Sequence, residues 1–450
     1  MKLLEKKLNS LTYPQIISLG YLIVIVLGTL LLSLPISSRN GESAGIINSL
    51  FTATSATCVT GLVVYDTYSQ WSLFGQLTIL TLIQIGGLGF MTIVTMFSFL
   101  LKRKIGLKER GLLKESVNTM YIGGIVRLTK KILFITFIFE TVGAIILSLR
   151  FIPKIGFIKG IYCGIFHSVS AFCNAGFDIM GRFGEYSSLT AFSGDAVVNL
   201  TIILLIVIGG IGFFVWDDLI KNKLNYKKYQ IHTKIVLFMT FLLIFLGAVL
   251  FYLSENSNLL TSKPFGEKLL ISLFASVTPR TAGFNTVDIA AMSPGSKLLT
   301  MVLMFIGGSP GSTAGGIKTT TTAVVFISLW ASLRNVKKEN IFGRRLEDDT
   351  LKKASAIISV NTVLVILSTF LINISNSSFA LSDVMFEVFS ALGTVGLSTG
   401  ITGSLDVFAK IIIVLLMYSG RVGSLSLALI FTEHRMPSVV QYPTEKINLG

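Results

Sequence analysis

The chain alternates long and short apolar runs in a pattern that recurs four times. Each copy has a long run, a short run that ends at a glycine, and a second long run with a glycine cluster of its own. The first long runs lie near 14–37, 130–152, 232–253 and 352–374, and the second near 72–101, 195–220, 296–333 and 405–432. Since about 20 apolar residues can cross a bilayer as a helix, we predict eight transmembrane helices.

The short runs end in four similar turns. The turns read TCVTGLV (57–63), FCNAGFD (172–178), RTAGFNT (280–286) and GTVGLST (393–399), so that Gly61, Gly176, Gly283 and Gly396 recur 115, 107 and 113 residues apart. Each preceding run has about 8–10 apolar and small hydroxyl residues, which is too short for a membrane span. We therefore expect four re-entrant half-helices, each between a first and a second span.

The predicted fold is an all-α polytopic membrane protein with four parallel M1–P–M2 pore repeats around one central pore, where M1 and M2 are spans and P is the half-helix. Irregular backbone at membrane depth is tolerated only inside protein or beside water, and four turns around one axis meet that condition. We divide the chain into repeat 1 (1–104), repeat 2 (105–221), repeat 3 with a broken second helix (222–334), repeat 4 (335–435) and a C-terminal tail (436–450).

Charge predicts the orientation of this arrangement. Only 14% of residues are charged, whereas soluble domains have about 25%. Basic residues gather in 102–131, 221–234 and 334–353, between one repeat and the next. The positive-inside rule places these loops and both termini in the cytoplasm, so the half-helices enter from the outside.

Composition also limits the classes of partner. A net charge of +15 can indicate nucleic-acid binding in a soluble protein, but here it lies in membrane loops, and we expect lipid and no nucleic acid. The three cysteines and three histidines are dispersed along the chain, which predicts neither a disulfide framework nor a metal cluster.

The four turns have the chemistry of a cation pore. Carbonyl oxygens from facing turns can replace the hydration shell of a cation, and glycine reaches the backbone angles that this requires. The half-helices also direct their partly negative C-terminal ends at the centre. We therefore predict a potassium pore and no enzyme activity. Asp66, Asp178 and Asp288 follow the first three turns and either collect cations at the outer mouth or are ordinary loop acids.

The stretch FIGGSPGSTAGGIKTTTT (305–322) at first resembles a phosphate-binding loop. That motif requires lysine directly after its last glycine, at the start of a βα unit, whereas Ile317 separates Gly316 from Lys318 inside an apolar run. Glycine weakens helices and proline lacks a backbone donor. We therefore predict a span that is broken in mid-membrane.

Three charged residues stand out deep within predicted spans, where ionisable groups are candidates for function. Arg421 is about level with the broken stretch and can hold it by hydrogen bonds. Lys318 either takes part in the same interaction or extends towards the cytoplasm. Glu140 lies in the middle of a first span, and the sequence names no partner for it.

Several motifs resemble those of the Trk/Ktr/HKT superfamily of potassium transporters over essentially the whole chain. They are the four turns, TAGFN above all, together with IGGLGFMT (85–92), IGLKER (105–110) and GSTAGGIKTTT (311–321). The chain begins directly with the first pore repeat, without the extra N-terminal spans usual in Trk-type subunits. It is therefore most similar to the membrane subunit of bacterial Ktr systems.

The resemblance implies a K⁺ selectivity filter of backbone carbonyls and an intramembrane gate. The filter residues are Val59, Thr60, Gly61, Leu62, Asn174, Ala175, Gly176, Phe177, Thr281, Ala282, Gly283, Phe284, Thr394, Val395, Gly396 and Leu397. The gate residues are Gly307, Gly308, Ser309, Pro310, Gly311, Ser312, Thr313, Ala314, Gly315, Gly316, Lys318 and Arg421. Some plant members that select sodium have serine at the first filter glycine, so Gly61 implies selectivity for potassium.

The resemblance also implies partners and a location. It implies a homodimer in the bacterial cell membrane on a cytosolic KtrA-like ring of RCK domains, with ATP or ADP on the ring only and no covalent cofactor. The basic loops either dock this ring or only set the topology. Whether Na⁺ acts as an activator or a coupled ion stays open. The alternatives are an ion-coupled secondary transporter for another cation or small solute and, less favoured, an ATP-using membrane enzyme.

Overall fold

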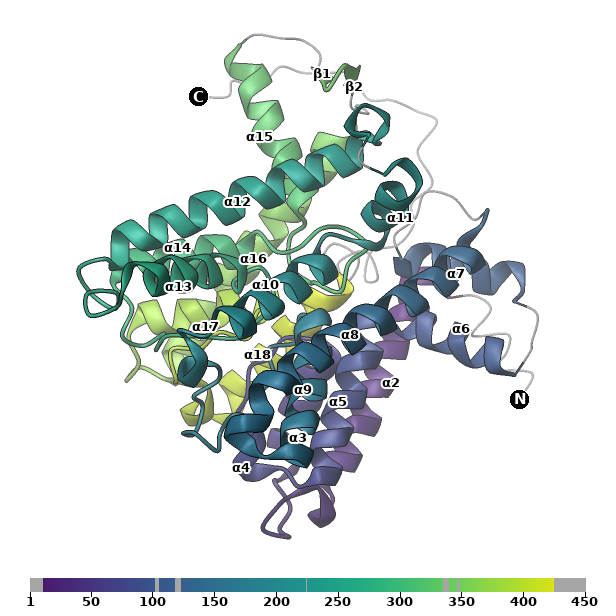
Figure 1. Cartoon of the computed structure of the whole chain (residues 1–450). Helices are drawn as coiled ribbons and strands as arrows, with labels where there is room; N and C mark the ends of the chain where they lie inside the picture. The colour runs from purple at the N-terminus through teal and green to yellow at the C-terminus, as the bar shows by residue number, and fades with distance from the viewer. Residues whose placement is uncertain are drawn as a thin grey trace.

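The computed structural model describes residues 11–101, 105–117, 123–223, 225–334, 340–345 and 349–424. These residues are mostly helical (Figure 1). Four helices are long and apolar enough to cross a membrane, and each coincides with a predicted first span: α2 (Tyr13–Ser33), α8 (Ile125–Ile155), α12 (Ile231–Glu255) and α16 (Thr350–Ser375). Their outward side chains are large and apolar, as contact with lipid requires, for example Leu22, Phe137, Phe241 and Ile366.

Each of these long helices is followed by a shorter one at the place of a predicted half-helix. These are α3 (Ile46–Thr57), α9 (Phe157–Phe172), α13 (Phe265–Val277) and α17 (Leu381–Gly393). They contain 12, 16, 13 and 13 residues, which is longer than the apolar runs of about 8–10 residues but still shorter than a membrane span. The sequence revealed only the apolar part, because their first turns contain polar or glycine residues.

The second spans are interrupted more often than expected. We predicted a broken helix in repeat 3, where residues 306–318 separate α14 (Pro294–Phe305) from α15 (Thr319–Leu333). In addition, α5 (Leu73–Leu88) and α6 (Phe90–Leu100) meet at a bend of 100°, and α10 (Ala196–Gly210) and α11 (Phe213–Asn222) at a bend of 95°.

Glycine explains these bends, since Gly89 and Gly212 have φ values of +85° and +96° that end an α-helix. The fourth second span, α18 (Val407–Val422), likewise ends at Gly423 with φ +98°.

Short elements connect these helices. They are η1 (Pro35–Ser37), α4 (Thr67–Gln70), α7 (Leu107–Val117), η2 (Thr190–Phe192), η3 (Tyr226–Lys228) and η4 (Thr402–Ser404). The strands β1 (Asn340–Ile341) and β2 (Arg344–Arg345) form an antiparallel hairpin that the sequence did not predict. Its turn, Phe342–Gly343, has positive φ at both residues, as tight hairpin turns require.

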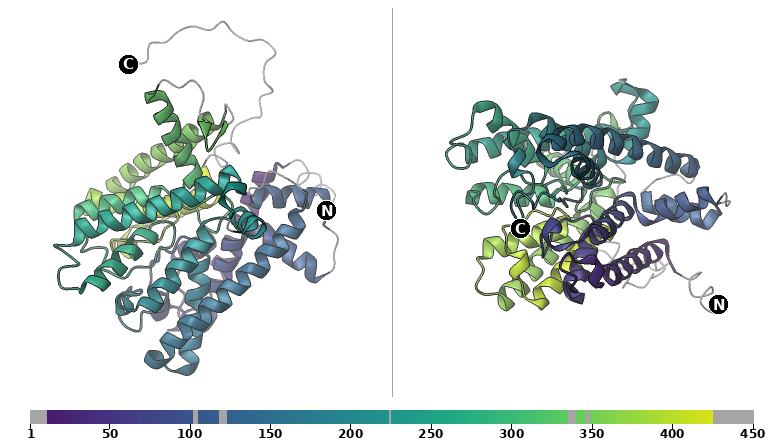
Figure 2. Two further views of the ribbon diagram at one scale, coloured as in Figure 1. Left: turned by 45° about the horizontal axis from the view of Figure 1, so that its top comes forward. Right: turned by 60° about the horizontal axis from the view of Figure 1, so that its bottom comes forward.

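The helices surround a common centre in chain order (Figure 2). We call α2–α6 unit one, α8–α11 unit two, α12–α15 unit three and α16–α18 unit four. The second span of each unit packs against the short helix of the next: α5 on α9, α10 on α13, α14 on α17, and α18 on α3. The last pair closes the circle, which confirms the predicted all-α arrangement. The division at residues 104, 221, 334 and 435 stays a prediction.

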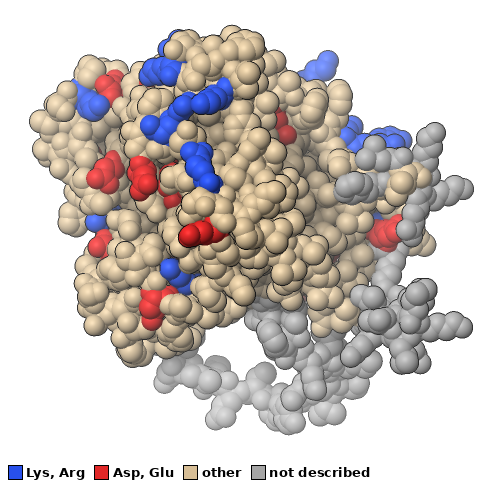
Figure 3. All heavy atoms as spheres, turned by 90° about the horizontal axis from the view of Figure 1, so that it is seen from below, with Lys and Arg blue, Asp and Glu red and all other residues tan. Residues whose placement is uncertain are grey.

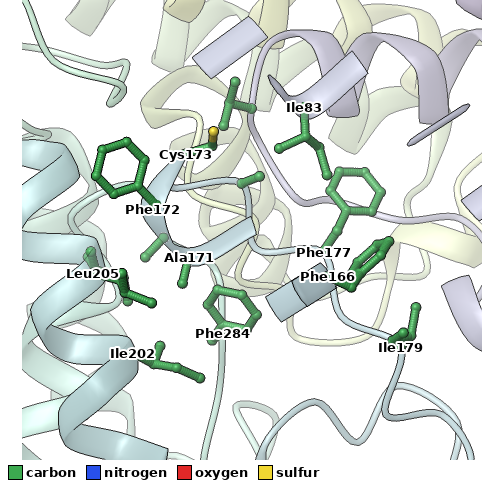
Figure 4. Close-up of a cluster of buried hydrophobic side chains, with 14 of the residues drawn as sticks. Ile83, Phe166, Ala171, Phe172, Cys173, Phe177, Ile179, Ile202, Leu205 and Phe284 are labelled. Atoms are coloured by element: carbon green, nitrogen blue, oxygen red, sulfur yellow. The ribbon is translucent and has the colours of Figure 1, made fainter. Parts of the chain in front are cut away.

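Aromatic side chains fill the space between the units. Phe166 and Phe172 of α9 lie beside Ile83 of unit one and Phe284 of unit three (Figure 4). Phe51, Phe166, Phe274 and Phe386 occupy the same position in the four short helices, and each is fully buried. Charged side chains on the face drawn in Figure 3 are few and scattered, in line with the composition.

Candidate functional site

The four predicted turns share one backbone conformation at the C-terminal ends of the short helices. The residue two before each glycine has positive φ: Val59 (58°), Asn174 (57°), Thr281 (68°) and Thr394 (51°). The glycines follow with φ values of 92° (Gly61), 71° (Gly176), 80° (Gly283) and 90° (Gly396). Positive φ is an outlier for β-branched residues, and such strain gathers at functional sites.

The turns touch one another in a closed ring, which we call the turn ring (59–62, 174–177, 281–284 and 394–397). A Cβ atom added to each glycine would lie at most 2.8 Å from a carbonyl oxygen of a neighbouring turn. The pairs are Gly61 with Ala175, Gly176 with Ala282, Gly283 with Val395 and Gly396 with Thr60. The structure therefore brings all sixteen predicted filter residues together, with room for glycine alone at four positions.

Side-chain hydroxyls from the short helices support the turn ring. The amides of Gly61 and Gly396 donate to the hydroxyls of Ser55 and Ser390, at 3.1 and 3.0 Å. In the other two units the hydroxyls donate to ring carbonyls, Ser170 to Phe177 at 2.7 Å and Thr278 to Phe284 at 2.5 Å. The sequence contained a signal for this role: a hydroxyl residue six positions before the glycine, or five in unit three.

In unit three the spacing between the hydroxyl residue and the ring glycine is one residue shorter, and the backbone at the C-terminal end of α13 adjusts to it. The amides of Thr60, Ala175 and Val395 donate to the carbonyl five residues earlier, whereas that of Ala282 donates to Thr278, four residues earlier. The turn therefore keeps its place in the ring although the unit is one residue shorter.

A cavity of about 410 Å³ opens on one side of the turn ring. It is lined by the four ring glycines and by Asp66, Asp178 and Asp288, so the structure brings the three acids together at one mouth. Asp66 accepts from the amides of Ser69 (2.8 Å) and Tyr186 (3.2 Å). Burial is the main cause that raises the pKa of Asp178 to about 7, with a smaller contribution from the charge of Asp66 and against the lowering effect of the Met180 amide. These carboxyl groups give the mouth a negative charge, which favours the approach of a cation.

The predicted gate residues form a loop that lies against the turn ring, which we call the glycine loop (307–318). An added Cβ on Gly315 would meet the Thr394 side chain of the ring, and one on Gly307 would lie 3.3 Å from that of Thr281. The amide of Gly307 donates to the carbonyl of Ile317 at 2.9 Å, which closes the loop at its base.

The glycine loop is bound to the glycine clusters in the second spans of units two and four. Its amides at Ser309 and Thr313 donate to the carbonyls of Gly210 and Gly209, at 2.9 and 3.2 Å, and that of Gly316 donates to Gly420 at 3.3 Å. These clusters were visible in the sequence, but their common role, contact with one loop, was not.

Arg421 and Lys318 both hydrogen-bond to the backbone of this region. Arg421 donates to the carbonyls of Thr313 and Gly86, and to that of Gly87 at 3.2 Å. Lys318 donates to the carbonyls of Ala314 (2.8 Å) and Gly315 (3.2 Å), so its ammonium group is directed at the glycine loop. None of the ion pairs among the described residues includes either side chain.

A second cavity, of about 270 Å³, lies beside the glycine loop. Its lining includes Gly311, Lys318 and Arg421, with Glu115 and Ser116 of α7. No residue of the turn ring lines it, whereas no residue of the glycine loop lines the 410 Å³ cavity. The glycine loop therefore stands between the turn ring and the second cavity.

Comparisons with known proteins identify the family of the chain. A model of the TrkH family, described as a cation transport protein, matches residues 4–442. Among curated relatives, the potassium/sodium uptake protein NtpJ of Enterococcus hirae is 40% identical over 100% of both chains. Ktr system potassium uptake protein B of Bacillus subtilis is 41% identical over 98% of this chain and 97% of its own.

A solved structure shares the fold. The crystal structure of the potassium transporter TrkH from Vibrio parahaemolyticus matches with a TM-score of 0.70 and 19% identity, over 92% of this chain and 84% of that chain. With these matches the expected superfamily resemblance is confirmed, and the chain is a multi-pass membrane transporter rather than an enzyme. It belongs to the TrkH family of cation transport proteins.

Proposed function

We propose that the chain is the potassium-translocating membrane subunit of a Ktr-type uptake system. The observation that carries this proposal is the turn ring, in which each glycine faces a neighbour's carbonyl oxygen at a distance that leaves no room for a side chain. Carbonyl oxygens arranged in this way replace the hydration shell of K⁺. The names of the relatives, which are potassium or potassium/sodium uptake proteins, support the choice of ion.

We further propose that the glycine loop gates this path, held in place by Arg421. The loop lies next to the turn ring, and single hydrogen bonds tie it to units two and four, each worth about 1 kcal/mol net. Such a loop can leave its position without unfolding the helices around it. The positive charges of Arg421 and Lys318, which lack acidic partners among the described residues, oppose the passage of a cation while the loop is in place.

The wider assembly is also part of the proposal. The subunit forms a homodimer in the bacterial cell membrane, with both termini in the cytoplasm, on a KtrA-like RCK ring that alone binds ATP or ADP. Na⁺ acts as an activator or a coupled ion, in line with the name of the Enterococcus relative. The basic loops are the docking surface for the ring. The tail 436–450 lies outside the described residues, and its role at a dimer interface stays a prediction.

Cation flux with the purified chain in liposomes tests the proposal. We expect rubidium uptake that external K⁺ inhibits by competition and that small organic solutes leave unchanged, with an increase when an RCK ring and ATP are added. Uptake that follows an added solute instead would favour a secondary transporter for that solute. Absence of cation flux, with intact protein in the vesicles, contradicts the proposed function.

A further inference from the structure

A groove of about 480 Å³ runs between α8 and α9 on the outer side of unit two. Its rim consists of the apolar side chains Phe137, Ile145, Leu149 and Ile165, which are 69%, 56%, 65% and 43% exposed. In a membrane-spanning helix such side chains face lipid, so the groove opens to the bilayer rather than to water. Its volume is in the range of pockets that hold small organic ligands, about 300–1,000 Å³.

Glu140 belongs to the lining of this groove, although its walls are otherwise mostly apolar. The side chain is at the middle of α8 and is 8% exposed. No ion pair among the described residues includes it. Its carboxyl oxygens accept only from the amide nitrogen of Gln84 on α5, at 3.1 and 3.2 Å, and more weakly from the thiol of Cys173. A buried carboxylate without a cationic partner is a favourable site for an incoming cation.

The residues around the Glu140 carboxyl group, Gln84 and Cys173, are close in sequence to groups that support the turn ring and the glycine loop. Cys173 directly precedes Asn174 of the turn ring, and its thiol also lies 3.5 Å from the side-chain oxygen of Gln84. Gln84 in turn is two residues before Gly86, whose carbonyl accepts from Arg421. A ligand that draws Glu140 away from Gln84 therefore changes the support of the turn ring and of the glycine loop together.

We propose that this groove is a binding site for lipid-soluble primary amines, with the alkyl chain between α8 and α9 and the ammonium group paired with Glu140. Access from the bilayer selects an amphiphile, and the carboxyl group at the end of the groove selects a cationic head. Binding reduces cation flux through the turn ring, an effect that rests on the proposed function.

The test uses the full chain in phosphatidylcholine vesicles, with rubidium flux measured against added dodecylamine. Dodecanol, with the same chain and no charge, is the matched control ligand. We expect dodecylamine to inhibit at a concentration about tenfold or more below that of dodecanol, the difference that one charge-assisted hydrogen bond provides. Glu140→Gln should remove this difference, and Ile165→Trp, which fills the groove and keeps the carboxyl group, should do the same.

Leu415→Trp on α18 is the control variant, since Leu415 is 62% exposed and does not line the groove. It should retain the full effect of dodecylamine. Equal inhibition of wild type, Glu140→Gln and Ile165→Trp would show a general effect on the bilayer and overturn the proposal.

A binding measurement separates this proposal from the function of the chain. A photoreactive alkylamine should label residues 137–149 or 161–169, and excess dodecylamine should compete with it. Labelling elsewhere, or labelling that dodecylamine does not reduce, contradicts the site whether or not the chain conducts cations. Labelling in the groove without any basal flux would support the site and contradict the proposed function.

Discussion

Three residues of the turn ring hold backbone angles that their own side chains disfavour. Val59, Thr281 and Thr394 are β-branched and have positive φ, which costs on the order of 1–3 kcal/mol each. The packed ends of the short helices and the hydroxyl groups behind the ring compensate for this cost. The ring glycines, two residues further along each turn, are required for two reasons. Their φ is positive, and a carbonyl oxygen of the neighbouring turn occupies the place where a Cβ atom would lie.

At Gly396 the effect of backbone strain can be separated by experiment from the effect of a Cβ atom that meets a carbonyl. Gly396→Ala places a Cβ against the carbonyl of Thr60, whereas Gly400→Ala, at φ +99°, places it in open space. Both changes cost about 1 kcal/mol of backbone strain, so both should lower the thermal midpoint slightly. Only Gly396→Ala should also reduce the preference for K⁺ over Na⁺ in flux, by about tenfold. Equal selectivity of the two variants would contradict the role of the turn ring.

At the scale of elements, the glycine loop interrupts the second span of unit three at the place where the four second spans meet. Glycines at 86, 209 and 420 let these spans approach the ends of the short helices, and the carbonyls of Gly209, Gly210 and Gly420 accept hydrogen bonds from the glycine loop. The position of the loop therefore depends on units two and four as well as on its own hydrogen bonds.

Arg421 is the side chain that joins the glycine loop to unit one, through the carbonyls of Thr313 and Gly86. We expect Arg421→Met to raise basal rubidium flux several-fold in liposomes without a partner ring, because these bonds and a positive charge are lost together. Arg150→Met is the control, since Arg150 pairs with Asp195 at 2.7 Å, away from the loop. A flux equal to wild type in both variants would exclude Arg421 from gating.

Deletion of residues 309–316 tests whether the glycine loop as a whole is the gate. The deletion removes the part of the glycine loop next to the turn ring and keeps Lys318 with α15. We expect higher basal flux that no longer responds to an RCK ring and ATP, as measured by rubidium uptake. If flux and its response stay unchanged, the loop is not the gate.

At the scale of the whole molecule, acidic side chains of three units line one mouth of the turn ring. The basic side chains Lys318 and Arg421 lie on its other side, at the glycine loop. Asp178 is an acid of this mouth whose charge changes near neutral pH, because burial raises its pKa to about 7. Its carboxyl group is therefore mostly neutral below pH 7 and mostly charged above it. Asp66 and Asp288 line the same cavity.

The external K⁺ concentration for half-maximal uptake should fall as pH rises from about 6 to 8. One charge across a hydrated cavity interacts with a cation by on the order of 1 kcal/mol, which is about fivefold in affinity. Asp178→Asn should lose this pH step, whereas Asp195→Asn, outside the cavity, should keep it. The step is measured by rubidium uptake at limiting K⁺, and its persistence in Asp178→Asn would assign it to another group.

Much of the architecture could be predicted because its signals are local. Run length identified the first spans, the repeated glycines located the four turns, and the family resemblance supplied the sixteen residues of the ring. The bends at Gly89 and Gly212 were missed, because a glycine within an apolar run is compatible with either a straight or a bent helix. The partner of Glu140 could not be named, since Gln84 belongs to another unit and is 56 residues away.

The sequence by itself determined the four repeats and the order of their first spans, short helices and glycine turns, since these depend on the length of apolar runs and on the backbone freedom of glycine. Only the tertiary structure decided which carbonyl faces each ring glycine, that one loop binds two other units, and that Glu140 lies in a groove open to lipid. These features depend on contacts between segments about 100 residues apart, for which a single sequence contains no local signal.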